Sequence, residues 1–183
     1  RGALGAYDAG TREFHLHSGC QGVHNVRDWI AGPILGISPS ELRVTCDDVG
    51  GGFGMKSVIY PEQVLVLWAA RRLDRPVKWI SERDEAFISD AQSREQDNEA
   101  SLALDANGRI LGLRVDIVAN MGGCLSGFAP AVPSRDGGPM LCGVYDIAAV
   151  DIRVRCVFTN TVPVDAYRGA GRPEASYIIE RLM

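Results

Sequence analysis

Alternating apolar and polar residues predict strands in several short stretches of the chain. Two stretches at the start, 2–8 and 13–18, are expected to form a hairpin that turns at Gly10. The strongest hairpin signal joins 99–104 to 110–119, because the intervening Asn-Gly pair adopts a tight turn at little cost. Further strands are predicted at 42–47, 77–81 and 149–158.

Apolar residues three or four positions apart predict helices in three places. In 24–35 they fall on one face, and Gly32-Pro33 is expected to kink that helix or end it early. The other two helices are 61–72, which has a proline in its first turn, and 173–183. In the helix at 61–72 the side expected to be buried carries Val64, Leu65, Leu67 and Trp68.

The order of these elements indicates the fold class. Strands and helices are mixed without regular alternation, and 122–138 is rich in glycine and proline and is expected to be a loop. We therefore expect an α+β fold with mixed sheets and packed helices. The length of 183 residues suits one domain over 1–183, or two small lobes that share a core.

Charge and composition exclude some classes of partner. The formal net charge is −4 and the sequence pI is about 5.4, which gives no electrostatic reason to bind nucleic acid or an acidic membrane surface. No apolar run approaches the ~18 residues of a membrane span, and no signal peptide is recognised. The chain begins within a strand-like run and stops within a helix pattern, so we expect an excised piece whose exposed apolar surface favours self-association.

The five cysteines indicate a reducing compartment. Their number is odd and no pair has the close spacing of a zinc or iron–sulfur site, so we expect no metal ligands and a cytoplasmic protein. Cys46 and Cys156 lie in apolar runs, where a reduced cysteine packs as a small hydrophobic residue.

Two glycine-containing loops are candidates for binding an anion. The first, Gly50-Gly51-Gly52-Phe53-Gly54-Met55-Lys56-Ser57, follows a predicted strand and precedes a helix. It misses the P-loop and dinucleotide-binding patterns because Met55 stands where each requires glycine. A tight turn, or a degenerate P-loop in which Lys56 and Ser57 serve phosphate and magnesium, therefore remain alternatives.

The second loop, Ala166-Tyr167-Arg168-Gly169-Ala170-Gly171-Arg172-Pro173-Glu174, places two arginines before a predicted helix. Helix N-termini and guanidinium groups both favour anions. A glycine- and proline-rich helix entry with solvated arginines is the plain alternative, but two loops of this kind in one acidic chain favour a bound anionic ligand.

At these residues the chain resembles the xanthine dehydrogenase and aldehyde oxidase family, the molybdenum hydroxylases, which includes carbon monoxide dehydrogenase large subunits. The first loop is similar to that family's GGGFG-x-K segment, and 166–174 is similar to its A-[FY]-R-G-x-G-x-P-[QE] segment. Upstream, Gln21-Gly22-Val23-His24-x-Val26-Arg27 resembles the family's T-Q-x-x-H-x-x-R segment. The three motifs occur in the expected order, and the resemblance covers nearly the whole chain, including Glu180-Arg181-Leu182-Met183.

The resemblance implies an enzyme that hydroxylates an aldehyde or an aromatic N-heterocycle with oxygen from water. It implies a molybdenum–molybdopterin cofactor, expected in the cytosine dinucleotide form, with [2Fe-2S] and FAD centres on partner subunits or domains. Gln21 and Arg168 would lie at the reacting centre. The residues implied to bind the cofactor are Gln21, Gly51, Gly52, Phe53, Gly54, Arg168, Gly169 and Gly171, with the amides of Phe53 and Gly54 facing it.

Two departures from the family's patterns narrow the implied substrate. Ser57 stands where purine-oxidising members have glutamate, and Gly169 stands where the molybdenum–copper enzymes have cysteine. Both xanthine and carbon monoxide are therefore disfavoured. The family's catalytic glutamate and the second half of its cofactor cradle lie later in the large subunit, so we expect the isolated chain to be inactive and to bind little or no cofactor. A non-catalytic assembly module is the remaining alternative.

Overall fold

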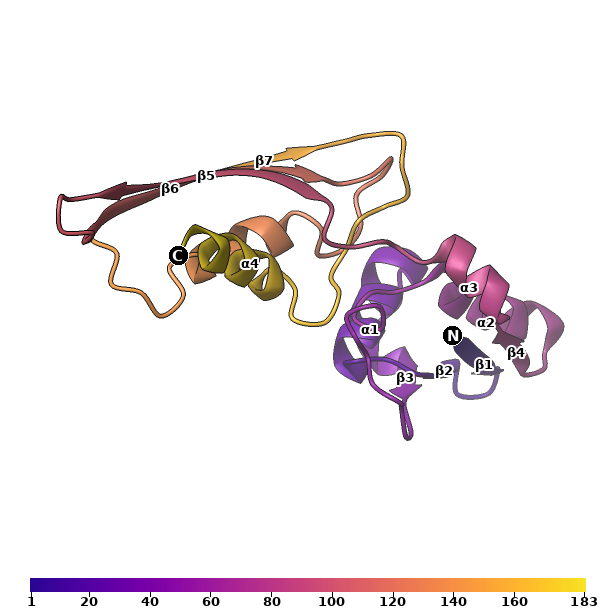
Figure 1. The fold of residues 1–183 in the computed structure, drawn as a ribbon. Coiled ribbons are helices and arrows are strands. Elements are labelled where there is room, and N and C mark those ends of the chain that lie inside the picture. The colour runs from indigo at the N-terminus through magenta and orange to yellow at the C-terminus, as the bar shows by residue number, and fades with distance from the viewer. The chain divides into compact units, whose positions relative to one another are not determined.

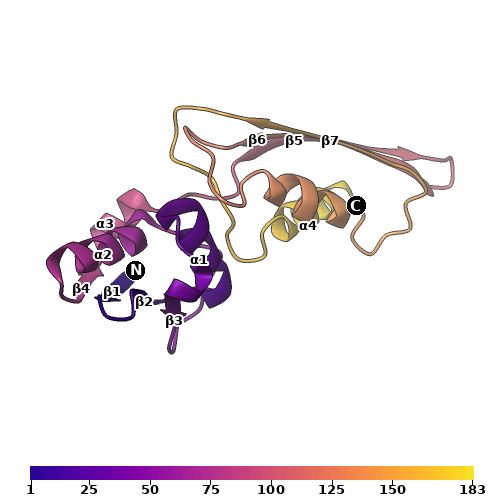
Figure 2. The same ribbon diagram turned by 180° about the vertical axis from the view of Figure 1, so that it is seen from behind.

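The computed structural model describes all 183 residues, which divide into two compact units, unit 1 (1–90) and unit 2 (91–183). Each unit is built of a sheet and helices, in agreement with the expected α+β class (Figures 1 and 2). Each also has its own hydrophobic core. The chain therefore folds around two cores, rather than around the shared core expected from its length.

Unit 1 contains a four-stranded sheet in the order β3-β2-β1-β4. β1 runs antiparallel to both β2 and β4, whereas β2 and β3 are parallel. The hairpin predicted at the start is confirmed, and so are the two single strands, although β3 ends two residues earlier than expected. The strands are β1 (Gly2–Asp8), β2 (Glu13–Ser18), β3 (Leu42–Thr45) and β4 (Val77–Ile80).

Helices cover one face of this sheet (Figure 1). α2 (Pro61–Leu73) packs mainly on β1, at a glycine: a Cβ at Gly5 would lie 2.6 Å from the backbone of Val66. α1 (Val23–Trp29) continues into a π-helix, Ile30–Leu35, which contains Pro33. The predicted disturbance at Gly32-Pro33 therefore takes the form of a wider helical turn. A short 3-10 helix, Pro39–Glu41, leads into β3.

One expectation for unit 1 was wrong, and one helix was not predicted. Leu65 and Trp68 of α2 are more than half exposed, and the buried stripe consists of Gln63, Val66, Leu67 and Ala70. The buried face of α2 differs from the expected one because it includes a polar residue, Gln63. The Gln63 side chain donates to Ser18 Oγ (3.1 Å) and accepts from Tyr60 N (3.0 Å). A third helix, α3 (Arg83–Ser89), was not predicted, since it buries no residue and has no apolar stripe.

Unit 2 contains a three-stranded sheet in the order β5-β6-β7. β5 (Gln96–Leu104) and β6 (Ile110–Asn120) form the predicted antiparallel hairpin, and β7 (Val150–Val157) runs parallel to β6. The turn between β5 and β6 uses Gly108 at φ +82°, and the Asp105 carboxylate accepts from the backbone N–H groups of Asn107 and Arg109.

α4 (Arg172–Leu182) covers one face of the unit 2 sheet, as both ribbon views show (Figures 1 and 2). The stretch expected to be a loop includes a π-helix, Val132–Gly137, and leads into a 3-10 helix, Gly138–Met140, and both contact α4. Cys156 is exposed in β7, so the expectation that it packs as a core residue was wrong. All five cysteines are free, and no helix is long and apolar enough to cross a membrane.

Candidate functional site

The glycine loop of unit 1, residues 50–57, lies between β3 and α2 and is held in an unusual backbone conformation. Gly51 (φ +96°) and Gly54 (φ +94°) take positive φ angles, and so does the non-glycine residue Phe53 (φ +57°). A non-glycine residue in this region is strained and is found more often at functional sites than elsewhere. The loop therefore has a backbone conformation that is more typical of functional sites than of ordinary connecting segments.

Gln21 lies directly against this loop. Its side-chain Oε1 accepts from the N–H of Gly54 (2.9 Å), and its backbone N–H donates to the carbonyl of Lys56 (2.9 Å). A Cβ at Gly52 would lie 2.1 Å from Gln21 Cγ, so only glycine at this position leaves room for the glutamine. Because Oε1 is used inside the loop, the NH2 group of Gln21 is the part that remains to donate to a ligand.

Gly54 is used differently from what the family resemblance implies. Its N–H, expected to face a cofactor, donates to Gln21 in this structure. Gly51 and Gly52 instead contribute carbonyl groups to the contacts that close the loop: Lys56 Nζ donates to Gly51 O (2.9 Å), and Lys56 N donates to Gly52 O (3.3 Å). Their own N–H groups take no part in these contacts.

The degenerate P-loop is not favoured by this arrangement. A P-loop lysine reaches toward bound phosphate at the start of a helix. Here the Lys56 ammonium donates to the loop's own backbone, and α2 begins only at Pro61. Lys56 therefore holds the loop closed.

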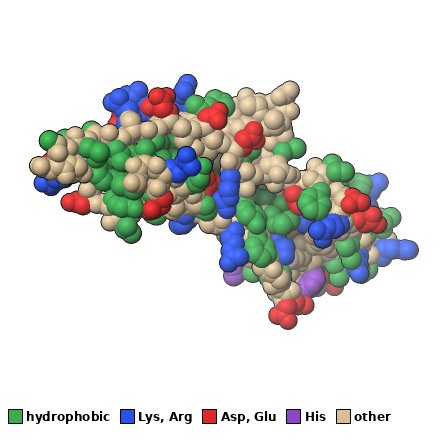
Figure 3. Space-filling model, in the orientation of Figure 1, with side chains coloured by type: hydrophobic (Ala, Val, Ile, Leu, Met, Phe, Trp, Pro, Cys, Tyr) green, Lys and Arg blue, Asp and Glu red, His purple; other side chains and the backbone are tan.

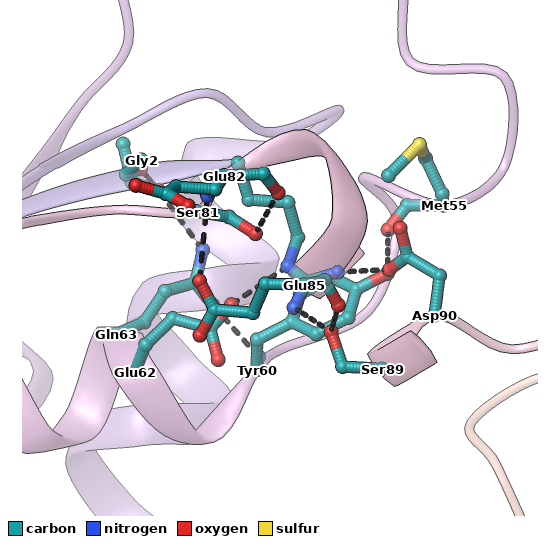
Figure 4. A network of polar contacts seen from close by, with 12 residues as sticks. Gly2, Met55, Tyr60, Glu62, Gln63, Ser81, Glu82, Glu85, Ser89 and Asp90 are labelled. Atoms are coloured by element: carbon teal, nitrogen blue, oxygen red, sulfur yellow. Dashed lines mark hydrogen bonds and ion pairs between the residues drawn. The ribbon is translucent and has the colours of Figure 1, made fainter. Parts of the chain in front are cut away.

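A partly buried polar network supports the far end of the loop (Figure 4). The Tyr60 hydroxyl donates to the carbonyl of Met55 (2.8 Å), and Arg1 lies over the Tyr60 ring, 4.1 Å from its centroid. Arg1 forms ion pairs with Glu62 (2.7 Å) and with Asp90. Burial, followed by the nearby Asp90 carboxylate, raises the pKa of Tyr60 well above its usual value, so the hydroxyl stays protonated as a donor.

The second loop, residues 166–171, runs into the N-terminus of α4 in unit 2. Gly169 (φ +88°) and Gly171 (φ +81°) shape it, and turn bonds join Ala170 N to Tyr167 O (2.7 Å) and Arg172 N to Gly169 O (3.1 Å). A Cβ at Gly171 would lie 2.5 Å from Gly137 N and 2.6 Å from Val132 O. Gly171 therefore allows the loop to pack closely on the π-helix, and Arg168 lies exposed at the loop's surface.

Arg94 is a further residue of this site that the sequence did not reveal. Its guanidinium donates to the carbonyl of Arg168 (2.6 Å) and to Glu174 Oε1 (3.2 Å). These partners are 74 and 80 residues away in sequence, and no motif includes Arg94. Only the fold brings them together.

The predicted site residues thus gather in two places, one in each unit. Gln21 and the glycines of the first loop form a group in unit 1, and Arg168, Gly169 and Gly171 form a group in unit 2. On the face drawn in Figure 3, basic and acidic side chains both occur over each unit, in keeping with a chain that is not strongly basic.

The family model for the molybdopterin cofactor-binding domain matches residues 1–183, the whole chain. The chain belongs to this molybdopterin cofactor-binding domain family. Its α+β fold and the order of its three motifs agree with that assignment.

Curated relatives of this molybdopterin-binding chain are subunits of enzymes. The 6-hydroxypseudooxynicotine dehydrogenase complex subunit gamma of Paenarthrobacter nicotinovorans is 39% identical over 87% of this chain and 20% of its own length. The carbon monoxide dehydrogenase large chain of Hydrogenophaga pseudoflava is 36% identical over 100% of this chain and 23% of its own length. The chain therefore spans about a fifth of the length of these relatives.

Solved structures share the fold. Quinoline 2-oxidoreductase from Pseudomonas putida 86 matches 98% of this chain and 24% of its own chain, with a TM-score of 0.87 and 32% identity. The relatives are molybdopterin-dependent oxidoreductases, and this chain is similar to one part of such an enzyme.

Proposed function

We propose that this chain forms the first part of the cofactor-binding region of a molybdenum-dependent hydroxylase large subunit. In this proposal the loop at 50–57 and the loop at 166–171 hold molybdopterin, and Gln21 and Arg168 act at the reacting centre. The observation that carries the proposal is the contact between Gln21 and Gly54, which holds the Gln21 side chain against the glycine loop and leaves its NH2 group to donate to a ligand.

The residues of the two loops fit an anionic, oxygen-rich group. The free N–H groups of Gly51 and Gly52 and the amide NH2 of Gln21 are donors, and Arg168 adds a permanent positive charge. A Cβ built at Gly50 would meet nothing within 4 Å, so the chain leaves space beside the loop. Amide and guanidinium donors of this kind are suited to bind phosphate and oxo groups.

The molybdenum cofactor, when bound, supplies oxidation of a carbon atom with oxygen that derives from water. The chain's own contribution is to bind and orient. The Gln21 NH2 group would donate to an oxygen atom of the cofactor, and the Arg168 guanidinium would stabilise negative charge that develops on the substrate. The Gln21 side chain is held against the loop by the bond from the Gly54 N–H, which leaves its NH2 group to donate.

We propose an aromatic N-heterocycle or an aldehyde as the substrate. Quinoline 2-oxidoreductase is named for an N-heterocycle, which supports the first class. Copper-dependent oxidation of carbon monoxide is disfavoured at Gly169, where the family's copper-binding cysteine would be needed. At φ +88° a side chain is strained, and a Cβ would lie 3.1 Å from the Pro173 ring.

The finer cofactor and partner assignments are also part of the proposal. We propose the cytosine dinucleotide form of molybdopterin, partner subunits or domains that carry [2Fe-2S] and FAD, and a cytoplasmic location. One relative is named as a subunit of a dehydrogenase complex, which supports assembly with partners. The chain by itself is proposed to be inactive, because the later part of the large subunit would supply the catalytic glutamate.

The test is turnover by the full-length protein, with Gln21→Glu as the decisive variant. Glutamate keeps an oxygen for the Gly54 N–H but replaces the donor NH2 with an acceptor, so kcat/KM for quinoline or an aromatic aldehyde should fall roughly 100-fold or more. The exposed Asn160→Asp makes the same amide-to-carboxylate change and should leave kcat/KM unchanged. Equal kcat/KM in Gln21→Glu and wild type would contradict the role given to Gln21, and absence of label from H2(18)O in the product would contradict the reaction class.

A further inference from the structure

Arg94 connects three groups around the second loop. One arm of its guanidinium donates to the carbonyl of Arg168 (2.6 Å), and the other donates to Glu174 Oε1 in the first turn of α4 (3.2 Å). Its Cζ lies 5.1 Å from the centroid of the Tyr167 ring. The planar guanidinium of arginine can stack on a ring and donate hydrogen bonds in two directions at once. The ammonium group of lysine cannot reproduce this arrangement.

The backbone at Arg94 is strained. Its φ of +62° is one of only four positive values at non-glycine residues. Backbone bonds hold the segment in place on both sides: Gln92 N donates to Pro163 O (2.9 Å), Asp165 N donates to Gln92 O (2.8 Å), and Asn120 N donates to Glu95 O (3.0 Å). Backbone strain that neighbouring hydrogen bonds enforce in this way is common at functional sites, where the orientation of a side chain must be fixed.

The Glu174 carboxylate is the third observation. Its side chain is 9% exposed, and while Oε1 pairs with Arg94, Oε2 is buried without a hydrogen-bond partner. A buried carboxylate oxygen without a partner is destabilising. Glutamate is therefore a poor choice for this position if its only role is to pack α4 on the sheet. The carboxylate also lies in the first turn of α4, where negative charge is favoured. Arg94 is the cation that compensates for the burial of this carboxylate.

We propose that Arg94 is a positioning residue that fixes the backbone of loop 166–171 and thereby directs the Arg168 side chain, and that Glu174 anchors Arg94 for this purpose. Because Arg94 holds the carbonyl of Arg168 itself, a shift of the guanidinium moves the residue that the proposed function places at the reacting centre. This inference rests on the proposed function for its catalytic consequence, but not for the effect of Arg94 on the loop.

The experiment uses the full-length protein with Arg94→Met, Arg94→Lys and the matched control Arg109→Met, which removes an exposed arginine from the β5–β6 turn. Hydrogen exchange of the peptide that covers 166–172 reports on the loop directly, through the turn amides of Ala170 and Arg172. In Arg94→Met exchange there should become about tenfold faster, as expected for the loss of a charge-assisted hydrogen bond. Arg94→Lys should restore only part of the protection, and Arg109→Met should leave it unchanged.

Kinetics test the catalytic consequence. In Arg94→Met, kcat should fall about tenfold or more with molybdenum content per protein and KM close to wild type, because the loop is misplaced and the cofactor is still held. Glu174→Gln should act in the same direction with a smaller effect. Faster exchange with unchanged kcat would overturn the link to Arg168, and unchanged exchange in Arg94→Met would overturn the inference altogether. If Arg94→Met fails to fold, Arg94→Lys decides by the same two readouts.

Failure of the proposed function is distinguishable from failure of this inference. If the wild-type protein contains no molybdenum and turns over neither substrate class, the proposed function is lost. The exchange measurement would then still show whether Arg94 fixes the loop.

Discussion

Replacing Gly171 with alanine should destabilise unit 2 through two separate effects. The first is conformational: at φ +81° an alanine pays roughly 1–2 kcal/mol relative to a right-handed or extended backbone. The second is steric, since the new Cβ would lie 2.5 Å from Gly137 N and 2.6 Å from Val132 O. These are backbone atoms, so the clash can be relieved only by moving the loop away from the π-helix, at a cost of about 1–3 kcal/mol.

Gly108→Ala isolates the first effect. Gly108 has nearly the same φ of +82°, but a Cβ there would meet nothing within 4 Å. Its substitution should therefore cost only roughly 1–2 kcal/mol, whereas Gly171→Ala should cost about 2–5 kcal/mol. Both glycines belong to unit 2, so the same measurement serves for both.

The assay is urea unfolding. Hydrogen exchange in the peptides that cover β6 and α4 monitors it and gives the free energy of unfolding of unit 2. In the 183-residue chain, tryptophan fluorescence provides an internal comparison, because its three tryptophans, Trp29, Trp68 and Trp79, all belong to unit 1. Equal free energies of unfolding for Gly171→Ala and Gly108→Ala would refute the reasoning, since they would show that Gly171 is not packed against the π-helix backbone.

Three further predictions follow from unit 1. Lys56→Met removes the ammonium bond to Gly51 O, so hydrogen exchange in 50–57 should become faster, with a loss of about 1–3 kcal/mol in local stability; an unchanged exchange rate would contradict the closing role of Lys56. Tyr60 has a raised pKa, chiefly because of burial, so its contribution to stability is fully present below its ordinary value of 10.0 and is lost as the pH rises above it. Wild type should therefore lose more stability than Tyr60→Phe between pH 9 and 11 in thermal melts, and parallel profiles would count against this. Burial likewise raises the pKa of the Cys20 thiol, so iodoacetamide should modify the exposed Cys124 well before Cys20, as mass spectrometry of timed samples would show; simultaneous labelling would mean that Cys20 is not in the core.

Local signals in the sequence were sufficient for much of the fold. The β5–β6 hairpin was predictable because its turn chemistry lies within four residues, Asp105 to Gly108. The strands β1 and β2 followed from alternation alone. α3 was not predictable in this way, since an exposed helix of seven residues needs no apolar stripe.

Long-range partners explain what the sequence did not show. Gln63 is buried in α2 because Ser18, 45 residues earlier, accepts its amide, and no local pattern contains that information. In the candidate site, family motifs identified Gln21 and Arg168, but the contacts of Arg94 depend on the path of the chain between β5 and α4. The motifs thus predicted candidate site residues, and the fold shows which residues contact them.

The most direct test of the central claim is the molybdenum and pterin content of the full-length protein, purified from its own host. The account predicts about one molybdenum and one pterin per protein chain, as expected for one molybdopterin cofactor-binding domain per chain. A correctly folded full-length protein that contains neither molybdenum nor pterin would contradict it.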